Sequence, residues 1–572
     1  MSPPDQDAPI DDAGAADAIG DAAPTDSPIA PLREIELKLD LDRTALDALR
    51  GHAAFAAALA KAKAPRRLLA TYFDTPDGRL AAHGASLRIR REGRVRIQTL
   101  KIGSGAAAGL FDRDEWEVRV AGDTLDFDAL AATPLAKLFA KRKVRAALAP
   151  LYAVETRRRI LSLDESGAQA RLVLDEGTVR VGERSEPFCE IELELVQGTH
   201  ADLFRIARGL AEAAPLSLGT RSKAQRGAAL AAGEGPRIVK QVPPGLTPAM
   251  SAGEAFQAIA RACLKQLAGN EAALREQRAP GAVHQSRVAL RRLRAALSLF
   301  APILEEGPRR ALSAELKWMA DQLGAARDLD VVIATVVEPM RAGDPEDPAL
   351  VRLSEAFAAR REEAFAGALA ASSSARYRLM QIDAAAFVEA GNWREGANAT
   401  RDEPVARFAR RSLRKRAAKV LAGLGCTPTA KPGRRDTLAE PIGKGAARRA
   451  LAALSIEARH DLRIAVKKLR YATEFFAGIF VGGEAGDLSA KAAGARHEAT
   501  LDALEALQED LGALNDLAVG DRLAASFPEP DPLLAEGLAR LARPDAEDAA
   551  AEHLAAAAKA VKRLASAKPF WA

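Results

Sequence analysis

Acidic side chains recur at every second position in two segments of the first 230 residues. Glu34, Glu36 and Lys38 alternate with apolar residues, and so do Glu190 and Glu192. In an extended strand, residues two apart lie on the same face, so each segment presents its carboxylates together. Carboxylate oxygens are the ligands that hard divalent cations prefer. These segments therefore predict carboxylates that hold a divalent cation.

Basic side chains follow the same alternation in other segments. Arg88 and Arg90 share one strand face. A third segment places four charged residues on one face, namely Arg113, Glu115, Glu117 and Arg119. Guanidinium groups bind phosphate oxygens through paired hydrogen bonds. A half-solvated sheet would explain any one of these segments, whereas a closed barrel with a charged interior explains all of them together.

A basic motif occurs twice in the second half of the chain. At about 100° per residue, its first copy forms one narrow stripe of a helix: His284, Arg287, Arg291 and Arg294. The second copy has the same offsets: His460, Arg463, Lys467 and Arg470. A second element, residues 322–329, returns in the same order as residues 510–517. Two repeated elements predict two related helical bundles, over about 251–385 and about 400–572, and the stripes predict a polyanion surface.

Composition divides the chain into four parts. Residues 1–31 contain seven Asp residues and neither Lys nor Arg, and we interpret them as a disordered acidic tail. Residues 32–230 alternate as strands do, residues 231–250 are rich in Gly and Pro and form a linker, and residues 251–572 are helical. We therefore predict a multidomain protein, with an α+β antiparallel closed β-barrel followed by an all-α domain of two related helical bundles.

Charge and cysteine content limit the class of protein. The net charge is +5, and it rises to +12 when the seven aspartates of the tail are set aside, which favours a polyanionic partner. The three cysteines lie far apart, which argues against a disulfide framework or a thiolate zinc site. No apolar run is long enough for a membrane span and no secretory signal is evident, so we expect a cytoplasmic protein without a membrane partner.

The charged strands resemble a known family. Residues 34–38 form the ExExK signature of the CYTH superfamily, the triphosphate tunnel metalloenzymes, and the resemblance covers about 32–230. It continues in order through residues 72–76, 87–90, 99–101, 114–116, 174–177, 189–194 and 222–227. The ordered set is far more specific than ExExK alone, which any charged strand can produce.

This resemblance implies roles for the matching positions. The implied catalytic residues are Glu34, Glu36 and Lys38. The implied ligands of Mg²⁺ or Mn²⁺ are Glu34, Glu36, Asp175, Glu190 and Glu192. The implied triphosphate-binding residues are Lys38, Arg88, Arg90, Lys101, Glu115, Arg158 and Lys223. Glu117 is the alternative to Glu115, and only strand parity separates Arg158 from its neighbours Arg157 and Arg159.

The implied activity is a metal-dependent inorganic triphosphatase, which cleaves tripolyphosphate to diphosphate and phosphate. A class IV adenylate cyclase or a thiamine triphosphatase on the same fold is one alternative. A non-enzymatic polyphosphate-binding scaffold is another. The rows of carboxylates argue against the scaffold, because a negative ring would not help a tunnel that only binds phosphate.

The basic helices resemble the CHAD domain, a conserved-histidine α-helical domain, over about 251–572. The resemblance implies that the two basic stripes bind long-chain polyphosphate, and that the protein associates with polyphosphate granules. Protonation of the histidines, whose ordinary pKa is about 6.5, should strengthen this binding as the pH falls. We do not expect nucleic acid as a partner, because the chain has no recognisable nucleic-acid-reading motif and few aromatic residues for base stacking.

Overall fold

The structure is a computed structural model in which the chain divides into two compact units. It describes residues 32–103, 109–165, 167–430, 436–482, 488–516, 527, 530–541 and 546–572, except for the side chains of residues 32–34, 112, 515, 516, 546 and 547. The predicted tail, residues 1–31, lies outside the described residues. Among the described residues, the first unit holds 32–103, 110–199 and 221–233, and the second holds 200–220 and the chain from 234 onward.

The first unit is built on a ring of eight antiparallel strands. Around the ring the order is β5-β4-β3-β2-β6-β7-β8-β1, and β1 also pairs with β5. The first half of β1 pairs with β5 and its second half pairs with β8, so that the sheet forms a nearly closed barrel. The strands are β1 (Leu32–Asp40), β2 (Arg66–Asp74), β3 (Ala85–Glu92), β4 (Val95–Ile102), β5 (Leu110–Arg119), β6 (Ala149–Glu165), β7 (Ala168–Val181) and β8 (Arg184–Gln197).

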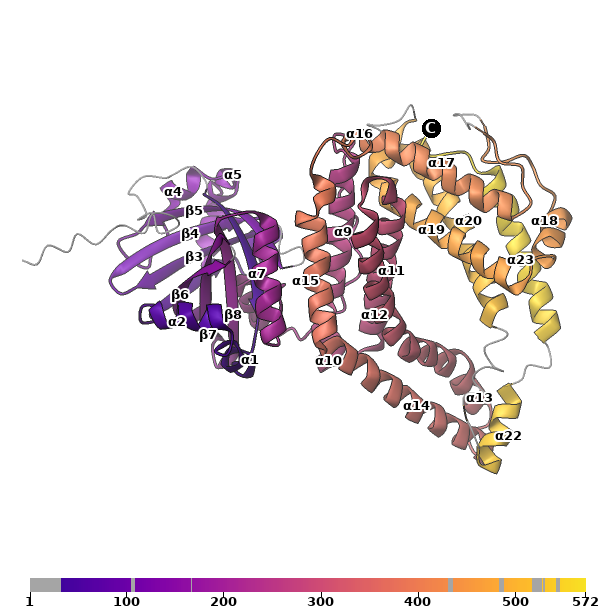
Figure 1. Cartoon of the computed structure of the whole chain (residues 1–572), viewed down its shortest axis with the longest axis horizontal. Coiled ribbons are helices and arrows are strands. Elements are labelled where there is room, and N and C mark those ends of the chain that lie inside the picture. Colours follow the sequence, from indigo (N-terminus) through magenta and orange to yellow (C-terminus); the bar gives the residue numbers. More distant parts are fainter. Residues whose placement is uncertain are drawn as a thin grey trace, which may run out of the picture. The chain divides into compact units, whose positions relative to one another are not determined.

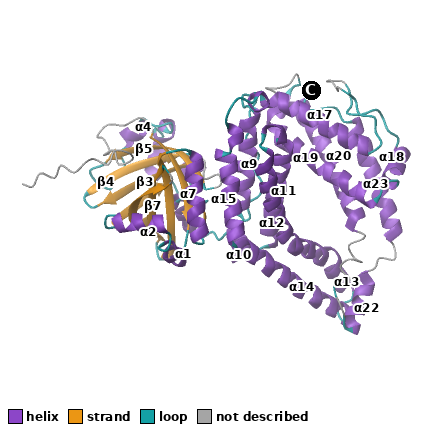
Figure 2. Ribbon diagram, viewed as in Figure 1, coloured by secondary structure: helices purple, strands orange, loops and turns teal. Residues whose placement is uncertain are grey.

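Apolar side chains lie on the outer face of this barrel, and charged side chains lie on its inner face. The outward residues Leu87 and Leu100 are buried against a layer of short helices that includes Leu138 and Phe139. The alternate residues of the same strands, among them Arg88, point into the barrel. Figures 1 and 2 show the strands with helices around them. The helices are α1 (Arg43–Leu49), α2 (Ala53–Lys61), α3 (Arg79–Ala82), α4 (Phe127–Ala131), α5 (Ala136–Phe139), α6 (Arg142–Ala147) and α8 (Lys223–Ala232).

In the described part of the second unit, the regular elements are helices and the two-residue strand β9 (Ser217–Leu218). Helices α9, α11, α12 and α15 run side by side, and α19, α20 and α23 form a second group (Figure 1). The helices are α7 (His200–Ala213), α9 (Ala252–Gly269), α10 (Glu271–Glu276), α11 (Pro280–Leu299), α12 (Glu306–Val332), α13 (Glu338–Gly343), α14 (Pro348–Ser373), α15 (Ala375–Ala390), α16 (Ala399–Asp402), α17 (Val405–Gly423), α18 (Lys444–Ala452), α19 (Ile456–Val481), α20 (Ala490–Asp516), α22 (Pro532–Leu541) and α23 (Ala546–Ser566).

The two repeat halves share one aromatic core. Phe300, which follows α11, stacks on Phe408 of α17 with ring centroids 4.8 Å apart. Phe256 of α9 and Phe476 of α19 contact the same pair from either side. This core fixes α11 of the first half beside α19 of the second half, and these two helices carry the duplicated basic motif.

The predicted fold class is confirmed: an antiparallel barrel is followed by an all-helical region. Residues His200–Ala213 form α7, which packs on α15 within the second unit. None of the described helices combines the length and apolarity that a membrane span requires.

Candidate functional site

Three carboxylates meet inside the barrel. Asp175 of β7 pairs in register with Glu190 of β8, and Glu192 follows two residues later on the same face. One carboxylate oxygen from each of the three lies within 4.8 Å of the others, and all three residues are buried. The alternation of β7 and β8 therefore concentrates three negative charges in a volume that a single cation could bridge.

Three basic side chains neutralise this acidic cluster. The Lys38 amine lies 2.8 Å from Glu190 and 3.3 Å from Glu192. The Lys223 amine lies 2.8 Å from Asp175 and 3.0 Å from Glu192, and it also contacts Glu190. The Arg158 guanidinium donates two hydrogen bonds to Asp175, at 2.9 and 2.7 Å. A metal ion bound to these carboxylate oxygens would therefore compete with the two amines and with the guanidinium.

The neighbouring basic charges keep Asp175 and Glu192 ionised. Burial alone would raise the pKa of Glu192, but Lys223, Lys38 and Arg158 outweigh burial and hold that pKa well below its usual value. The Oε2 atom of Glu190 is buried and has no hydrogen-bond partner. An orphaned, buried carboxylate oxygen is costly unless something binds it. The donor set of three buried carboxylates with one unpartnered oxygen fits a hard divalent cation.

Lys223 reaches the cluster because α8 begins at that residue. Ser222 accepts a hydrogen bond from the Gln225 backbone while the Gln225 side chain accepts one from the Ser222 backbone, which is a capping box. The Tyr152 hydroxyl donates to the Ala224 carbonyl at 2.9 Å. Gly227 faces the Tyr152 ring so closely that a Cβ would overlap it. The cap and this close approach together set the position of the Lys223 amine.

We therefore expect Gly227→Ala to displace α8. Overpacking of a close contact costs about 1–3 kcal/mol, and it should appear as a lower free energy of unfolding in urea together with weaker triphosphate binding. Gly209→Ala is the matched control, because Gly209 also lies inside a helix but has open space around it. Equal stability of the two variants would contradict the role given to Gly227.

Basic residues dominate the region formed by β3, β4 and β5. Arg88 donates to the Tyr72 hydroxyl at 3.3 Å and lies 3.9 Å from Glu115. Arg90 lies 3.6 Å from Glu117. These contacts are longer than good ion-pair hydrogen bonds. The Nε atoms of both arginines are buried without a hydrogen-bond partner.

Burial and the neighbouring Arg88 lower the pKa of Arg90, because both disfavour the charged form. The charge of Arg90 is thus incompletely compensated, whereas Tyr72, Glu115 and Glu117 outweigh burial and raise the pKa of Arg88. A bound anion would supply negative charge and would accept hydrogen bonds from the unpartnered Nε atoms. Arg88 and Arg90, two of the residues expected to bind phosphate, thus lie close together on one face of the barrel.

The structure brings most of the predicted tunnel residues together. Lys101 lies 3.3 Å from Glu115, and both the predicted Glu115 and its alternative Glu117 point inward with Arg88 and Arg90. Arg158, rather than Arg157 or Arg159, faces the acidic cluster. The backbone of Glu34 pairs with Arg113 on β5, but the side chain of Glu34 lies outside the described residues.

Two charged residues of the interior were not among the predicted site residues. Arg113 contacts Glu36 at 2.6 Å, and Arg171 lies 3.6 Å from Glu194 and is only 17% exposed. Strand parity could have found both, because Arg113 shares a face with Glu115 and Arg171 shares one with Asp175.

In the helical unit the two basic stripes converge. The charges of Arg463 and Arg470 on α19, and of Arg287 and Arg291 on α11, all act on Lys467. Burial, followed by these charges, lowers the pKa of Lys467 to about 8. Buried Nε atoms of Arg291, Arg294 and Arg463 have no hydrogen-bond partner. The two helices thus form one cationic surface with open donors.

The predicted stripe residues are not equivalent. Arg470 is held by Glu474 at 2.8 Å and Glu505 at 3.2 Å, so its charge is largely compensated within the protein. The histidines also differ, since His284 is half-buried and His460 is exposed. Burial, followed by Arg327, Arg291 and Arg287, lowers the pKa of His284. Any strengthening of binding through protonation of His284 is therefore expected below pH 6.5 rather than at neutral pH.

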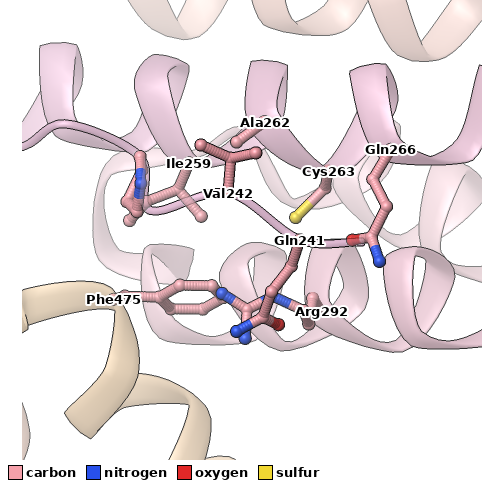
Figure 3. A pocket seen from close by; sticks show the side chains of 9 residues that line it. Gln241, Val242, Ile259, Ala262, Cys263, Gln266, Arg292 and Phe475 are labelled. Atoms are coloured by element: carbon pink, nitrogen blue, oxygen red, sulfur yellow. The ribbon is translucent and has the colours of Figure 1, made fainter. Parts of the chain in front are cut away.

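A small cavity is lined by residues of α9, α11 and α19 and by the segment 241–244 (Figure 3). Its one charged lining residue, Arg292, forms a buried ion pair with Glu474 and lies 4.7 Å from the centre of the Phe475 ring. Because the guanidinium already has its counterion, the cavity offers no free charge to a phosphate. The contacts of Arg292 with Glu474 and Phe475 instead join α11 of the first repeat half to α19 of the second.

Comparison with known proteins agrees with this division of the chain. The family model described as the CYTH domain matches residues 32–228, and the model described as the CHAD domain matches residues 258–525. An inorganic triphosphatase of Haemophilus influenzae is 28% identical over 158 residues, which are 27% of this chain and 44% of that protein. The match thus spans under half the length of this relative.

Solved structures are also similar to parts of the chain. The CHAD domain from the plant Ricinus communis is 28% identical, covering 56% of this chain and 95% of its own, with a TM-score of 0.41. A Hippeastrum protein, described as an adenylyl cyclase that reveals a dominant triphosphatase activity, is 19% identical, covering 35% of this chain and 96% of its own, with a TM-score of 0.27.

Proposed function

The chain carries a CYTH domain followed by a CHAD domain, and from this premise we propose that its barrel is a metal-dependent inorganic triphosphatase. The proposed reaction cleaves tripolyphosphate to diphosphate and phosphate. The observation that carries the proposal is the division of one barrel interior into two parts. A buried carboxylate cluster with an unpartnered oxygen would supply a cation site, and arginines with unpartnered Nε atoms would supply donors for phosphate.

Each part has a role in binding the substrate. Arg88 and Arg90 would hold phosphate oxygens with the donors that the protein leaves unpaired. Lys38, Lys101, Arg158 and Lys223 would add positive charge along the interior. Because the side chains are buried, their attraction for a polyanion is screened less than it would be in water. The negative charge of the substrate would therefore balance positive charge of the basic side chains inside the barrel.

The reaction needs positioning more than covalent chemistry. Asp175, Glu190 and Glu192, with Glu36 and Glu34, would hold Mg²⁺ or Mn²⁺, and a bound cation supplies further neutralisation of phosphate charge. A water molecule attacks the terminal phosphorus, the bond to the bridging oxygen breaks, and diphosphate leaves. The protein's basic side chains stabilise the charge on the leaving oxygen, and an interior carboxylate accepts the proton of the water.

A panel of substrates tests which triphosphate is used. Tripolyphosphate, ATP, thiamine triphosphate and long-chain polyphosphate would each be given to the full chain with Mg²⁺ or Mn²⁺, and kcat/KM compared. We expect the highest value for tripolyphosphate. Cyclic AMP and diphosphate from ATP would move the barrel to the cyclase class, and preference for thiamine triphosphate would replace the proposed substrate. Binding without turnover would leave a scaffold.

For the helical domain, we propose that the surface formed by α11 and α19 binds long-chain polyphosphate. Its members belong to both repeats and converge on Lys467, whose pKa is lowered by four basic neighbours: Arg463, Arg291, Arg287 and Arg470. A flexible polyanion can follow such a surface through charge and hydrogen bonds.

The affinity of this surface for polyphosphate should fall as the pH rises from 7 to 9. The pKa of Lys467 is about 8 in the free protein, and a bound polyanion raises it, so binding takes up a proton. The Lys467 charge contributes fully to the affinity well below pH 8. Above pH 8 this contribution is lost, and the affinity is about tenfold lower at pH 9 if the bound lysine stays charged. The measurement is the dissociation constant of long-chain polyphosphate at constant ionic strength.

Lys467→Arg is the control for this pH dependence. An arginine keeps its charge across the whole range, so the variant should bind with a nearly constant affinity between pH 7 and 9. A wild-type affinity that does not change over this range would show that Lys467 does not gain a proton on binding.

A further inference from the structure

Both repeats contain a glycine inside a long helix. Gly324 lies in α12 and Gly512 lies in α20, and each follows a buried leucine, Leu323 or Leu511. Glycine is among the least favourable residues for a helix interior. Neither glycine was explained by the proposed polyphosphate surface, although both belong to the element that the sequence repeats.

The space beside Gly324 is filled by an arginine of the basic stripe. A Cβ on Gly324 would lie 2.7 Å from Nη1 of Arg287, 3.5 Å from its Cζ and 3.8 Å from its Nη2. All three atoms belong to the guanidinium group. The repeat has the same pairing, because a Cβ on Gly512 would meet Nε and Nη2 of Arg463, each at 3.9 Å. Each glycine therefore faces the equivalent arginine of its own repeat.

Little else fixes the Arg287 side chain. Its Nη2 atom lies 3.7 Å from Asp328, whose own side chain is 74% exposed. Its Nη1 atom is buried and has no hydrogen-bond partner. A distant, exposed carboxylate holds a guanidinium weakly. The position of the guanidinium is thus set mainly by its packing against α12 at Gly324, which has no Cβ.

We propose that Gly324 is a positioning residue for the polyanion surface: the absence of its Cβ lets the Arg287 guanidinium lie against α12, where it meets a phosphate chain. This inference rests on the proposed binding of polyphosphate by α11 and α19. It adds a residue that cannot itself contact a phosphate through a side chain. It also makes the first repeat the more tightly constrained of the two.

The test compares Gly324→Ala with Gly512→Ala in the full chain. In Gly324→Ala the added Cβ meets only the end of a flexible side chain, so the helix should form and the melting temperature should stay the same or rise. The guanidinium must move, and the affinity for long-chain polyphosphate should fall about tenfold, as for loss of one charge-assisted hydrogen bond. In Gly512→Ala the contact is an ordinary 3.9 Å, and the affinity should stay within about twofold.

A double-mutant cycle shows whether Gly324 acts through Arg287. Arg287→Ala should weaken binding, and Gly324→Ala added to Arg287→Ala should weaken it no further. If Gly324→Ala binds like the wild type, or if the two losses add, the inference is overturned while the polyphosphate surface stands. If the wild type itself binds no polyphosphate, the proposed function of the helical domain and this inference both fail.

Discussion

Glu190→Gln is expected to abolish most of the phosphate release from tripolyphosphate. Glu190 offers the one buried carboxylate oxygen of the cluster that has no partner within the protein, and glutamine removes the charge while keeping the shape. Groups that merely orient metal ligands are worth about 10- to 100-fold, so we expect a loss of kcat/KM of at least about 100-fold. The measurement is the initial rate over a range of Mg²⁺ concentrations.

The matched control is Glu183→Gln, which removes an exposed carboxylate from the turn between β7 and β8. It should leave the rate unchanged. The Glu190→Gln chain should remain folded, because Lys38 and Lys223 keep Glu192 as a partner at 3.3 and 3.0 Å. Undiminished hydrolysis by a folded Glu190→Gln variant would remove Glu190 from the site.

Lys223→Met should make the stability of the barrel depend on divalent metal. The Lys223 amine contacts all three carboxylates of the buried cluster, and methionine fills similar volume without charge. Breaking a buried ion pair by removal of one partner costs about 3–5 kcal/mol. In EDTA we therefore expect a loss of this order in the free energy of unfolding.

A divalent cation should recover part of that loss, because it takes the place of the missing positive charge. Ligand binding to the folded state alone stabilises it by about 2.7 kcal/mol at one hundred times the dissociation constant. Hydrogen exchange of β7 and β8, measured with Mg²⁺ and with EDTA, reports this locally. Lys61→Met, at an exposed position of α2, should show no such metal effect. A metal effect on stability no larger in Lys223→Met than in the wild type would contradict the idea that a divalent cation can take the place of the Lys223 amine.

Strand parity made much of the barrel interior predictable from the sequence. Alternation of charged and apolar residues placed Glu36, Lys38, Glu190 and Glu192 on one face, and the structure has them buried together. Parity also separates Arg158 from its neighbours. Arg113 was within reach of the same reasoning, because it is two residues from Glu115.

Other features depend on packing that a periodic pattern does not contain. The apolar stripe of α7 predicts a helix but not that it packs on α15. The sequence pattern assigns no role to Gly227 or Gly324, and only their close contacts with the Tyr152 ring and the Arg287 guanidinium explain why glycine is needed there. Arg470 was grouped with the binding stripe, although Glu474, four residues later, was visible as a partner at helical spacing.

The most direct test of the account is the set of products that the full chain forms from tripolyphosphate, followed by phosphorus NMR with Mg²⁺ and with EDTA. The account predicts that phosphate and diphosphate appear in equal amounts with Mg²⁺, and that neither appears in EDTA. Release of both products in EDTA, or none in either condition, would contradict a metal-dependent triphosphatase in this barrel.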